Sequence, residues 1–319
     1  VVISDFIKAA DISFLPEIEA AGAVFTNNGK TEDMLTKIKS AGCNTIRIRL
    51  WKDPANGHSG LTEVKTLSQR VKKASLKVWL TVHYSDDWAD PAVQTTPAAW
   101  KNLSFTDLKA AVASYTTTIL TEINPDIIQI GNEINTGLLW PQGHLINQEA
   151  QCIDLLKTMS TTIRSKAPST KIMIHYAGVS ATDTNWFFTK VKSVDYDYIG
   201  LSYYPIWHGK DLATIKTTID ALGKNFSKKV LIAETAYPFT LGFNDWTNNI
   251  VGLDSQLVSG YPATAEGQKN FVLAIKDLVK SSTYGQGFAY WGGEWVSFKG
   301  NQATNGSTFE NQAFYDFSN

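Results

Sequence analysis

The sequence predicts an α/β fold, a single (β/α)8 TIM barrel with extended βα loops over residues 1–319. Three observations lead to this prediction. Eight short apolar segments of strand character occur along the chain, and all but the last precede a helical segment. Polar and aromatic clusters follow the C-terminal ends of these strands, where barrel enzymes carry their sites. No linker or change of composition divides the chain, and the Gly-rich phosphate turn of a doubly wound sheet is absent.

Charge and composition exclude some classes of partner. Lys and Arg number 29 against 30 Asp and Glu, for a net charge of -1, so nothing favours nucleic acid or an anionic membrane surface. No run of 18 apolar residues predicts a membrane span. Aromatic residues make up 12% of the chain, and many adjoin Gly, Pro, Asn or Asp, as in ligand sites that stack on sugar rings.

The two cysteines and the first residues bear on localisation. Cys43 and Cys152 have neither a metal-ligand spacing nor a disulfide framework, so we expect both to be reduced and buried. No basic region followed by an apolar stretch opens the chain, which is also how the mature form of an exported protein reads. We expect an exported monomer, in the extracellular space, at the cell surface or in the periplasm.

The first βα unit is predicted from Phe6 to Gly42. Residues 6–13 read as a strand that ends in Asp11 and Ser13. The next helix is predicted to begin near Thr31 as N-cap and to stop at Gly42.

The second strand, residues 45–51, carries two arginines. Its alternation places Arg47 and Arg49 on the face opposite the aliphatic residues. Arginine inside a barrel is costly unless carboxylates accompany it, which favours an ion-pair network. The alternative is a solvent-exposed edge strand.

Polar residues follow the third and fourth strands. The strand Lys77–Val82 leads to His83, Asp87 and Trp88. The apolar run that starts at Ile127 leads through Gly131 to Asn132 and Glu133, which predicts a buried parallel strand that delivers a carboxylate to a pocket. The alternative for Asn132 and Glu133 is that they cap the following helix.

The remaining strands add further candidates. A strand over residues 171–176 carries His175, which could equally be a core histidine. Alternation in the strand over residues 197–205 places Ser202 and Tyr204 on one face. The seventh strand ends in Glu234, and the eighth ends at Trp291 with Trp295 just beyond it. Two strands that end in glutamate predict a carboxylate pair.

Such a pair is typical of a glycosidase. Two carboxyl groups about 5 to 5.5 Å apart suit a retaining mechanism, in which one attacks the anomeric carbon and the other protonates the leaving oxygen. The nucleophile must be ionised, and Arg47 or Arg49 with the hydroxyl of Tyr204 would lower its pKa. Trp88 and Trp291 are expected to form the walls of a sugar subsite.

Seven motifs in order then resemble glycoside hydrolase family 53, the arabinogalactan endo-β-1,4-galactanases. They are RIRLW, HYSDDWADP, GNEINTGLLWP, KIMIH, SYYPIW, ETAYP and FENQAFYDF, and the resemblance runs from about Asp11 to Phe317. It implies Glu133 as acid/base, Glu234 as nucleophile and Asn132 as partner of the substrate 2-hydroxyl, with Arg47 and Tyr204 supporting the nucleophile. WGGEW and ETAYP depart from the family's WEPAW and ETNWP, which bears on subsite detail.

The resemblance also limits cofactors and alternatives. The chemistry requires no cofactor, whereas a structural calcium ion held by the oxygen-rich region Leu241–Asp254 is an expectation taken from bacterial relatives. A polysaccharide, β-1,4-galactan, is the expected partner. Mannan, xylan or cellulose as substrate, or a catalytically inactive sugar-binding barrel, are the competing hypotheses. In each case we expect the candidate side chains to converge at one mouth: Asp11, Arg47, Arg49, His83, Asp87, Trp88, Asn132, Glu133, His175, Tyr204, Glu234, Trp291 and Trp295.

Overall fold

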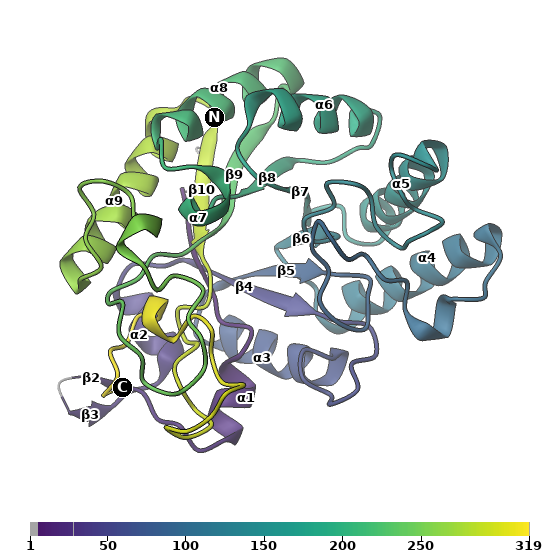
Figure 1. The fold of residues 1–319 in the computed structure, drawn as a ribbon. Coiled ribbons are helices and arrows are strands. Elements are labelled where there is room, and N and C mark those ends of the chain that lie inside the picture. The colour runs from purple at the N-terminus through teal and green to yellow at the C-terminus, as the bar shows by residue number, and fades with distance from the viewer. Residues whose placement is uncertain (1–5, 28, 319) are drawn as a thin grey trace.

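Eight parallel strands form a closed barrel in the computed structural model, which describes residues 6–27 and 29–318 (Figure 1). The order around the barrel is β1, β4, β5, β6, β7, β8, β9, β10 and back to β1, so each strand pairs with its sequence neighbours. The strands are β1 (Ile7–Asp11), β4 (Thr45–Leu50), β5 (Lys77–Val82), β6 (Ile127–Ile130), β7 (Lys171–Ala177), β8 (Tyr198–Ser202), β9 (Lys229–Thr235) and β10 (Gly285–Tyr290). The predicted barrel is thereby confirmed.

Helices cover the outside of the barrel (Figure 1). Side chains of Asp33, Ser104, Ser180 and Thr264 accept a backbone N–H at the start of four of them, which satisfies one otherwise unpaired donor each. The helices are α1 (Leu15–Ala20), α2 (Met34–Ser40), α3 (Leu61–Lys73), α4 (Phe105–Glu122), α5 (Glu149–Lys166), α6 (Ala181–Val191), α7 (Pro205–His208), α8 (Ala213–Phe226) and α9 (Ala265–Ser281).

The barrel interior divides into two levels. At the N-terminal end of the strands it is filled by apolar side chains, with the fully buried Trp79 among Ile127, Met173 and Leu231. Toward the C-terminal end the inward residues become polar, and Arg47 is buried there. The apolar level closes the barrel from below, so a site can form only at the C-terminal end, which we call the mouth.

Two long connections flank the mouth. The segment between β9 and α9 lies beside the segment that follows β10, and backbone hydrogen bonds join Trp246 to Ala303 and Ile250 to Thr308 (Figure 1). These are the extended βα loops that the sequence predicts.

Several local predictions were wrong. Helix α2 begins after Asp33, whose side chain caps it, whereas Thr31 belongs to the short strand β3 (Lys30–Thr31), paired with β2 (Thr26–Asn27). The hairpin and helix α1 escaped prediction because both are too short for a periodic pattern. The edge-strand alternative for residues 45–51 is excluded, because β4 pairs with both β1 and β5.

The cysteines agree only in part with the expectation that both are reduced and buried. Cys43 and Cys152 are both free, but only Cys152 is buried; Cys43 is partly exposed, so its predicted burial was wrong. None of the helices in the described part of the chain is long and apolar enough to cross a membrane.

Candidate active site

Arg47 organises the mouth from below. Its guanidinium contacts two carboxylates, Asp11 Oδ2 at 2.6 Å and Glu234 Oε1 at 2.7 Å. The same group donates to Asn132 Oδ1 at 3.1 Å and to Gln129 Oε1 at 3.3 Å. With 1% of its surface exposed, Arg47 is a buried cation whose two ion pairs raise its pKa against the effect of burial.

Glu234 is held by partners on both oxygens. Arg47 donates to Oε1, and the hydroxyl of Tyr204 donates to Oε2 at 3.0 Å. Burial raises the pKa of Glu234, while Arg47 and the Tyr204 hydrogen bond oppose that effect. The expected lowering of this pKa is therefore not observed, because burial outweighs the partners.

Glu133 leaves its strand through an unusual turn. Gly131 has φ +87°, and a Cβ there would lie 2.6 Å from Ile134 Cγ2, so only glycine fits. Glu133 itself has φ 48°, in the left-handed region, and its N–H donates to His175 Nδ1. The next helix, α5, starts only at Glu149, which excludes the capping alternative.

A hydrogen-bond relay supports the Glu133 carboxyl group. Since His175 Nδ1 accepts the Glu133 N–H, the ring carries its proton on Nε2, which donates to Ser202 Oγ at 2.9 Å. Ser202 must then donate its own hydrogen to Glu133 Oε1, at 2.5 Å. Burial and the Arg47 charge keep the pKa of His175 well below its ordinary value, so the ring is neutral.

The two glutamates approach each other across the mouth. A carboxyl oxygen of Glu133 lies within 4.8 Å of one of Glu234. Burial, followed by the nearby Glu234 carboxylate, raises the pKa of Glu133 to about 8. Within the described residues these glutamates and His175 form the one cluster with metal-ligand spacing, but both ring nitrogens of His175 already have protein partners.

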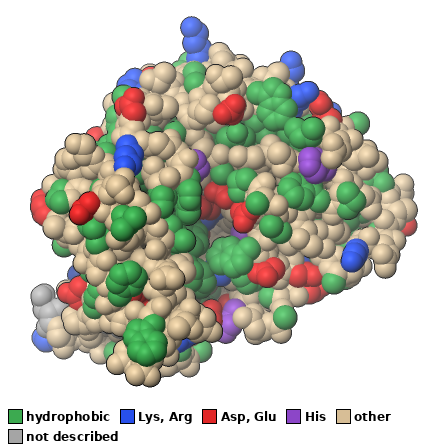
Figure 2. All heavy atoms as spheres, in the orientation of Figure 1, with side chains coloured by type: hydrophobic (Ala, Val, Ile, Leu, Met, Phe, Trp, Pro, Cys, Tyr) green, Lys and Arg blue, Asp and Glu red, His purple; other side chains and the backbone are tan. Residues whose placement is uncertain are grey.

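A pocket of about 410 Å³ opens above the pair. The walls are aromatic: Trp291 lies 4.7 Å from Phe309 and 6.3 Å from Trp88, measured between ring centroids. Figure 2 shows hydrophobic and acidic side chains gathered around a hollow between the loops. Nine of the predicted residues line the pocket: Arg47, Arg49, His83, Trp88, Asn132, Glu133, Tyr204, Glu234 and Trp291.

Histidine and amide groups in the pocket present hydrogen-bond donors. His83 Nδ1 accepts the Trp51 indole N–H and the backbone N–H of Ala89, so its Nε2 carries the proton. Its pKa is well below the ordinary value because it is buried beside arginine. Asn132 uses one amide hydrogen for the carbonyl of Ala89, which leaves the second for a ligand.

Arg49 differs from the expectation of a carboxylate partner. Its guanidinium lies 4.3 to 4.4 Å from the ring centroids of Phe14, Trp51 and Trp88, and Ser59 Oγ accepts its hydrogen bonds. Burial lowers the pKa of Arg49 to about 10. Arg49 therefore makes cation–π contacts instead of the predicted ion pairs, and one of these contacts holds Trp88 at the rim of the pocket.

Four predicted residues lie outside the pocket. Asp11 and His175 lie beneath it, where they contact Arg47 and Ser202. Trp295 stacks on Phe14 at 3.9 Å, behind Trp291. Asp87 is exposed outside the pocket lining, and its carboxylate accepts the N–H of Trp88; its contact with the substrate stays a prediction.

Other residues at the site were not predicted. Ser202 and Gln129 had a signal, since each is a polar residue on the inward face of a buried strand. Asp90, Trp207 and His208 follow strand ends, whereas Phe309 reaches the pocket from the C-terminal segment and had no signal. The pKa of His208 falls to about 4 through burial, so this ring too is neutral.

In the region predicted to hold calcium, both carboxylate oxygens of Asp245 accept hydrogen bonds from the protein. Asp245 Oδ1 accepts the N–H of Thr247, and Oδ2 accepts the hydroxyl of Ser297 at 2.9 Å. Each of these oxygens keeps a second lone pair, so the two hydrogen bonds do not decide whether the carboxylate could also hold a cation. The calcium site stays a prediction.

Comparisons with known proteins agree with this geometry. A profile of glycosyl hydrolase family 53 matches residues 7–319. The chain is 36% identical over 312 residues to an uncharacterized protein of Niallia circulans, which covers 92% of this chain and 85% of that one. It is 33% identical over 329 residues to the arabinogalactan endo-β-1,4-galactanase of Cellvibrio japonicus, with 98% and 86% covered. The GH53 catalytic domain of Ignisphaera aggregans matches with a TM-score of 0.93 at 35% identity, over 98% and 92% of the two chains.

Proposed function

The chain belongs to glycosyl hydrolase family 53, and from this premise we propose that it cleaves internal β-1,4-galactosidic bonds of galactan and arabinogalactan with retention of configuration. The observation that carries the proposal is the separation of the Glu133 and Glu234 oxygens, within 4.8 Å. Retaining glycosidases hold their carboxyl groups about 5 to 5.5 Å apart, whereas inverting ones leave about 6.5 to 9.5 Å for a water molecule.

In the first step Glu234 attacks the anomeric carbon. Its carboxylate is the better anion of the pair, because Arg47 and Tyr204 donate to both of its oxygens. Glu133 gives its proton to the departing glycosidic oxygen, the bond to that oxygen breaks, and a glycosyl ester forms on Glu234 with inversion. The raised pKa of Glu133, about 8, keeps it protonated for this step near neutral pH.

In the second step Glu133 changes from acid to base. Once Glu234 is esterified it has no charge, and the Coulomb contribution that it makes to the pKa of Glu133 is lost. The Glu133 carboxylate then takes a proton from water, which attacks the same carbon and releases Glu234 with a second inversion. Because Ser202 donates to Oε1, the proton is carried on Oε2.

The remaining groups orient the sugar. The second amide hydrogen of Asn132 is available for the 2-hydroxyl of the sugar bound at the nucleophile, and Nε2–H of His83 is a further donor. Trp88 and Trp291 offer flat faces to the C–H patches of the rings.

A panel of β-1,4-linked polysaccharides tests this function. We expect cleavage of galactan, with a fast fall in viscosity relative to reducing ends, and little or no cleavage of mannan, xylan or cellulose. NMR of the first products should give the β anomer before mutarotation. The proposal would be contradicted if the protein preferentially cleaved another polysaccharide, or if it bound galactan tightly but did not cleave it.

We further propose that the protein acts outside the cytoplasm, as a monomer, on pectin side chains. A polymeric substrate that cannot cross a membrane supports export, and the substrate of the named relative supports the pectin source. Fractionation of the producing cells and light scattering of the purified protein test the first two points. A calcium ion near Asp245 remains a secondary proposal, to be tested by the effect of a chelator on the melting temperature.

A further inference from the structure

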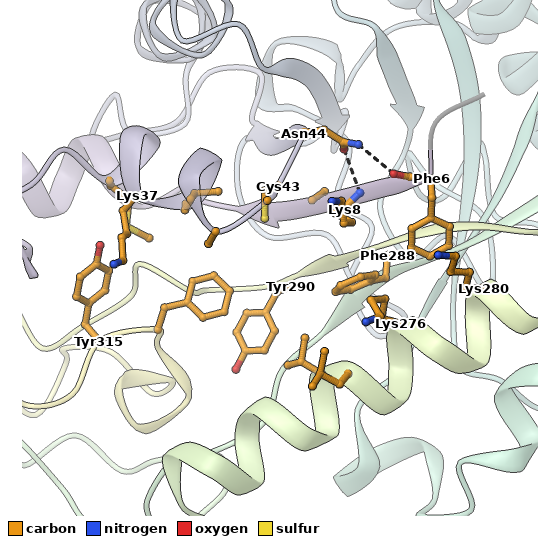
Figure 3. A pocket seen from close by; sticks show the side chains of 18 residues that line it. Phe6, Lys8, Lys37, Cys43, Asn44, Lys276, Lys280, Phe288, Tyr290 and Tyr315 are labelled. Carbon is orange, nitrogen blue, oxygen red and sulfur yellow. Dashed lines mark hydrogen bonds between the residues drawn. The ribbon is translucent and has the colours of Figure 1, made fainter. Parts of the chain in front are cut away.

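A second cavity, of about 880 Å³, lies on the outer wall of the barrel between helices α2 and α9 (Figure 3). Strands β1 and β10 form its floor, with Phe288 and Tyr290 on β10. Ile38 on α2 and Leu273 on α9 belong to its sides. Its volume falls within the range of about 300 to 1,000 Å³ that is usual for small-molecule sites. No residue assigned to the mechanism lines it.

The charges in this cavity are all of one sign. Lys8, Lys37, Lys276 and Lys280 line it, and none of the aspartates or glutamates in the described part of the chain does; we call it the lysine cavity. Lys276 lies 3.3 Å from Asp277, whose side chain is 69% exposed, and Lys37 lies 4.0 Å from Glu32. Exposed pairs of this kind contribute little. Lys8 and Lys280 form no ion pair with any of the described residues.

Lys8 is the most unusual of these lysines. Alternation along β1 directs Ile7 and Ala9 into the barrel and Lys8 outward, toward the layer where strands face helices. On β4 that layer receives Ile46 and Ile48. The amine of Lys8 lies beside Gly42, 3.5 Å from the point where a Cβ would stand. Lys8 is partly exposed, so its amine, which has no carboxylate partner among the described residues, can be reached by a ligand in the cavity.

The free hydrogen-bonding capacity of the lysine cavity is small. The Asn44 amide donates to the carbonyl of Phe6 and accepts the N–H of Lys8 (Figure 3). The Tyr290 hydroxyl donates to the carbonyl of Gln312 at 2.6 Å. A sugar needs many partners for its hydroxyls, so this lining suits a ligand with an apolar body and a negative charge.

We propose that the lysine cavity binds an amphiphilic carboxylate, with its apolar body against Phe288, Tyr290 and Leu273 and its carboxylate beside Lys8. Long-chain fatty acids and aromatic carboxylates such as cinnamates share this chemistry. Lys276 and Lys280, one turn apart on α9, supply the remaining positive charge.

Calorimetric titration of the full chain with dodecanoate and with cinnamate tests the proposal. We expect saturable binding of at least one of the two, while dodecanol and cinnamyl alcohol, which lack the charge, bind at least ten-fold more weakly. Lys8→Met keeps the apolar stem and should weaken binding roughly ten-fold, as expected for loss of one charged hydrogen bond. The matched control is Lys77→Met, an exposed lysine at the start of β5, which should leave the affinity unchanged.

A second variant keeps the test decisive if Lys8→Met fails to fold. Leu273 is 38% exposed on α9, so Leu273→Glu should be tolerated, and its carboxylate should pair with the lysines and exclude the ligand. Galactan hydrolysis should be unchanged in both variants. Absence of saturable binding of both dodecanoate and cinnamate would overturn the proposal. So would equal binding of the uncharged alcohols, or an unchanged affinity for the carboxylates in both variants. Binding of only dodecanoate or only cinnamate would identify the source.

Discussion

Glu234 and Glu133 lie at the same mouth, within 4.8 Å of each other, but their surroundings differ. Glu234 receives a hydrogen bond on each oxygen, one of them from the buried cation of Arg47. Glu133 receives one, from the neutral hydroxyl of Ser202. Burial raises both pKa values, although Glu133 is partly exposed and Glu234 is buried. The partners of the two carboxyl groups therefore provide the clearest difference between them.

The region at the end of β8 supports both the acid and the nucleophile. Ser202 ends β8 and Tyr204 follows two residues later, on the same face, yet Ser202 reaches Glu133 and Tyr204 reaches Glu234. What distinguishes the nucleophile is therefore the arginine from β4. A barrel mouth can assign acid and nucleophile by the placement of a single cation.

Removal of the nucleophile should have the largest effect on activity. Glu234→Ala should lower turnover of every substrate on the order of a million-fold, because no glycosyl ester can form. Steady-state rates on galactan and on an aryl β-galactoside, compared with the isosteric Glu234→Gln, measure this. Substantial residual activity on the aryl substrate would mean that the other glutamate is the nucleophile.

Removal of the acid should separate the substrates. Glu133→Ala should slow galactan hydrolysis by about 100-fold to 10,000-fold, the usual contribution of a general acid. An aryl galactoside with a good leaving group should lose much less in the first step, because it needs no protonation. Added azide should then give a β-galactosyl azide after two inversions. An α-configured azide would reverse the assignment of the two glutamates.

The sequence allowed both carboxylates to be identified before any coordinates. An apolar run that ends in Asn132 and Glu133, and another that ends in Glu234, are local patterns, and closure of the barrel brings such strand ends together. The cost of a buried charge predicted that carboxylates would accompany the arginines of the second strand, and Arg47 does pair with two of them, but the sequence did not identify Asp11 as a partner.

Other features could not be predicted because they depend on which side chains meet in space. Arg49 has the same sequence signal as Arg47, yet aromatic rings from three segments surround it, and no local pattern states which segments converge. Phe309 reaches the pocket from the far end of the chain. Asp87 and Asp90 both lie in one polar cluster, and only the turn geometry decides that Asp90 faces inward.

Loss of the Tyr204 hydroxyl tests how the partners of Glu234 set its pKa. Tyr204→Phe removes a hydrogen bond that favours the charged form, so the pKa of Glu234 should rise. Because the nucleophile must be ionised, the acidic limb of the kcat/KM profile should move to higher pH, with a loss of about ten-fold at neutral pH. The matched control is Tyr203→Phe, whose hydroxyl donates to the carbonyl of Gly209. If the acidic limb of Tyr204→Phe does not move, the Tyr204 hydroxyl does not affect the pKa of Glu234.

The smallest expected effect is on the Glu133 side. Ser202→Ala removes the hydroxyl that stabilises the charged Glu133, so the pKa of Glu133 should rise further above about 8. The acid must be protonated, and its deprotonation sets the alkaline limb of kcat/KM, which should therefore move to higher pH.

At neutral pH, where Glu133 is already protonated, the rate of Ser202→Ala should fall only a few-fold, through weaker orientation of the carboxyl group. Tyr204→Phe and Ser202→Ala thus shift opposite limbs of the profile, although both remove a hydroxyl two residues apart. An alkaline limb that moves to lower pH in Ser202→Ala would mean that the hydroxyl accepts a hydrogen bond from protonated Glu133. The proton of His175 would then have to lie on Nδ1, in conflict with the N–H that Glu133 directs at that atom.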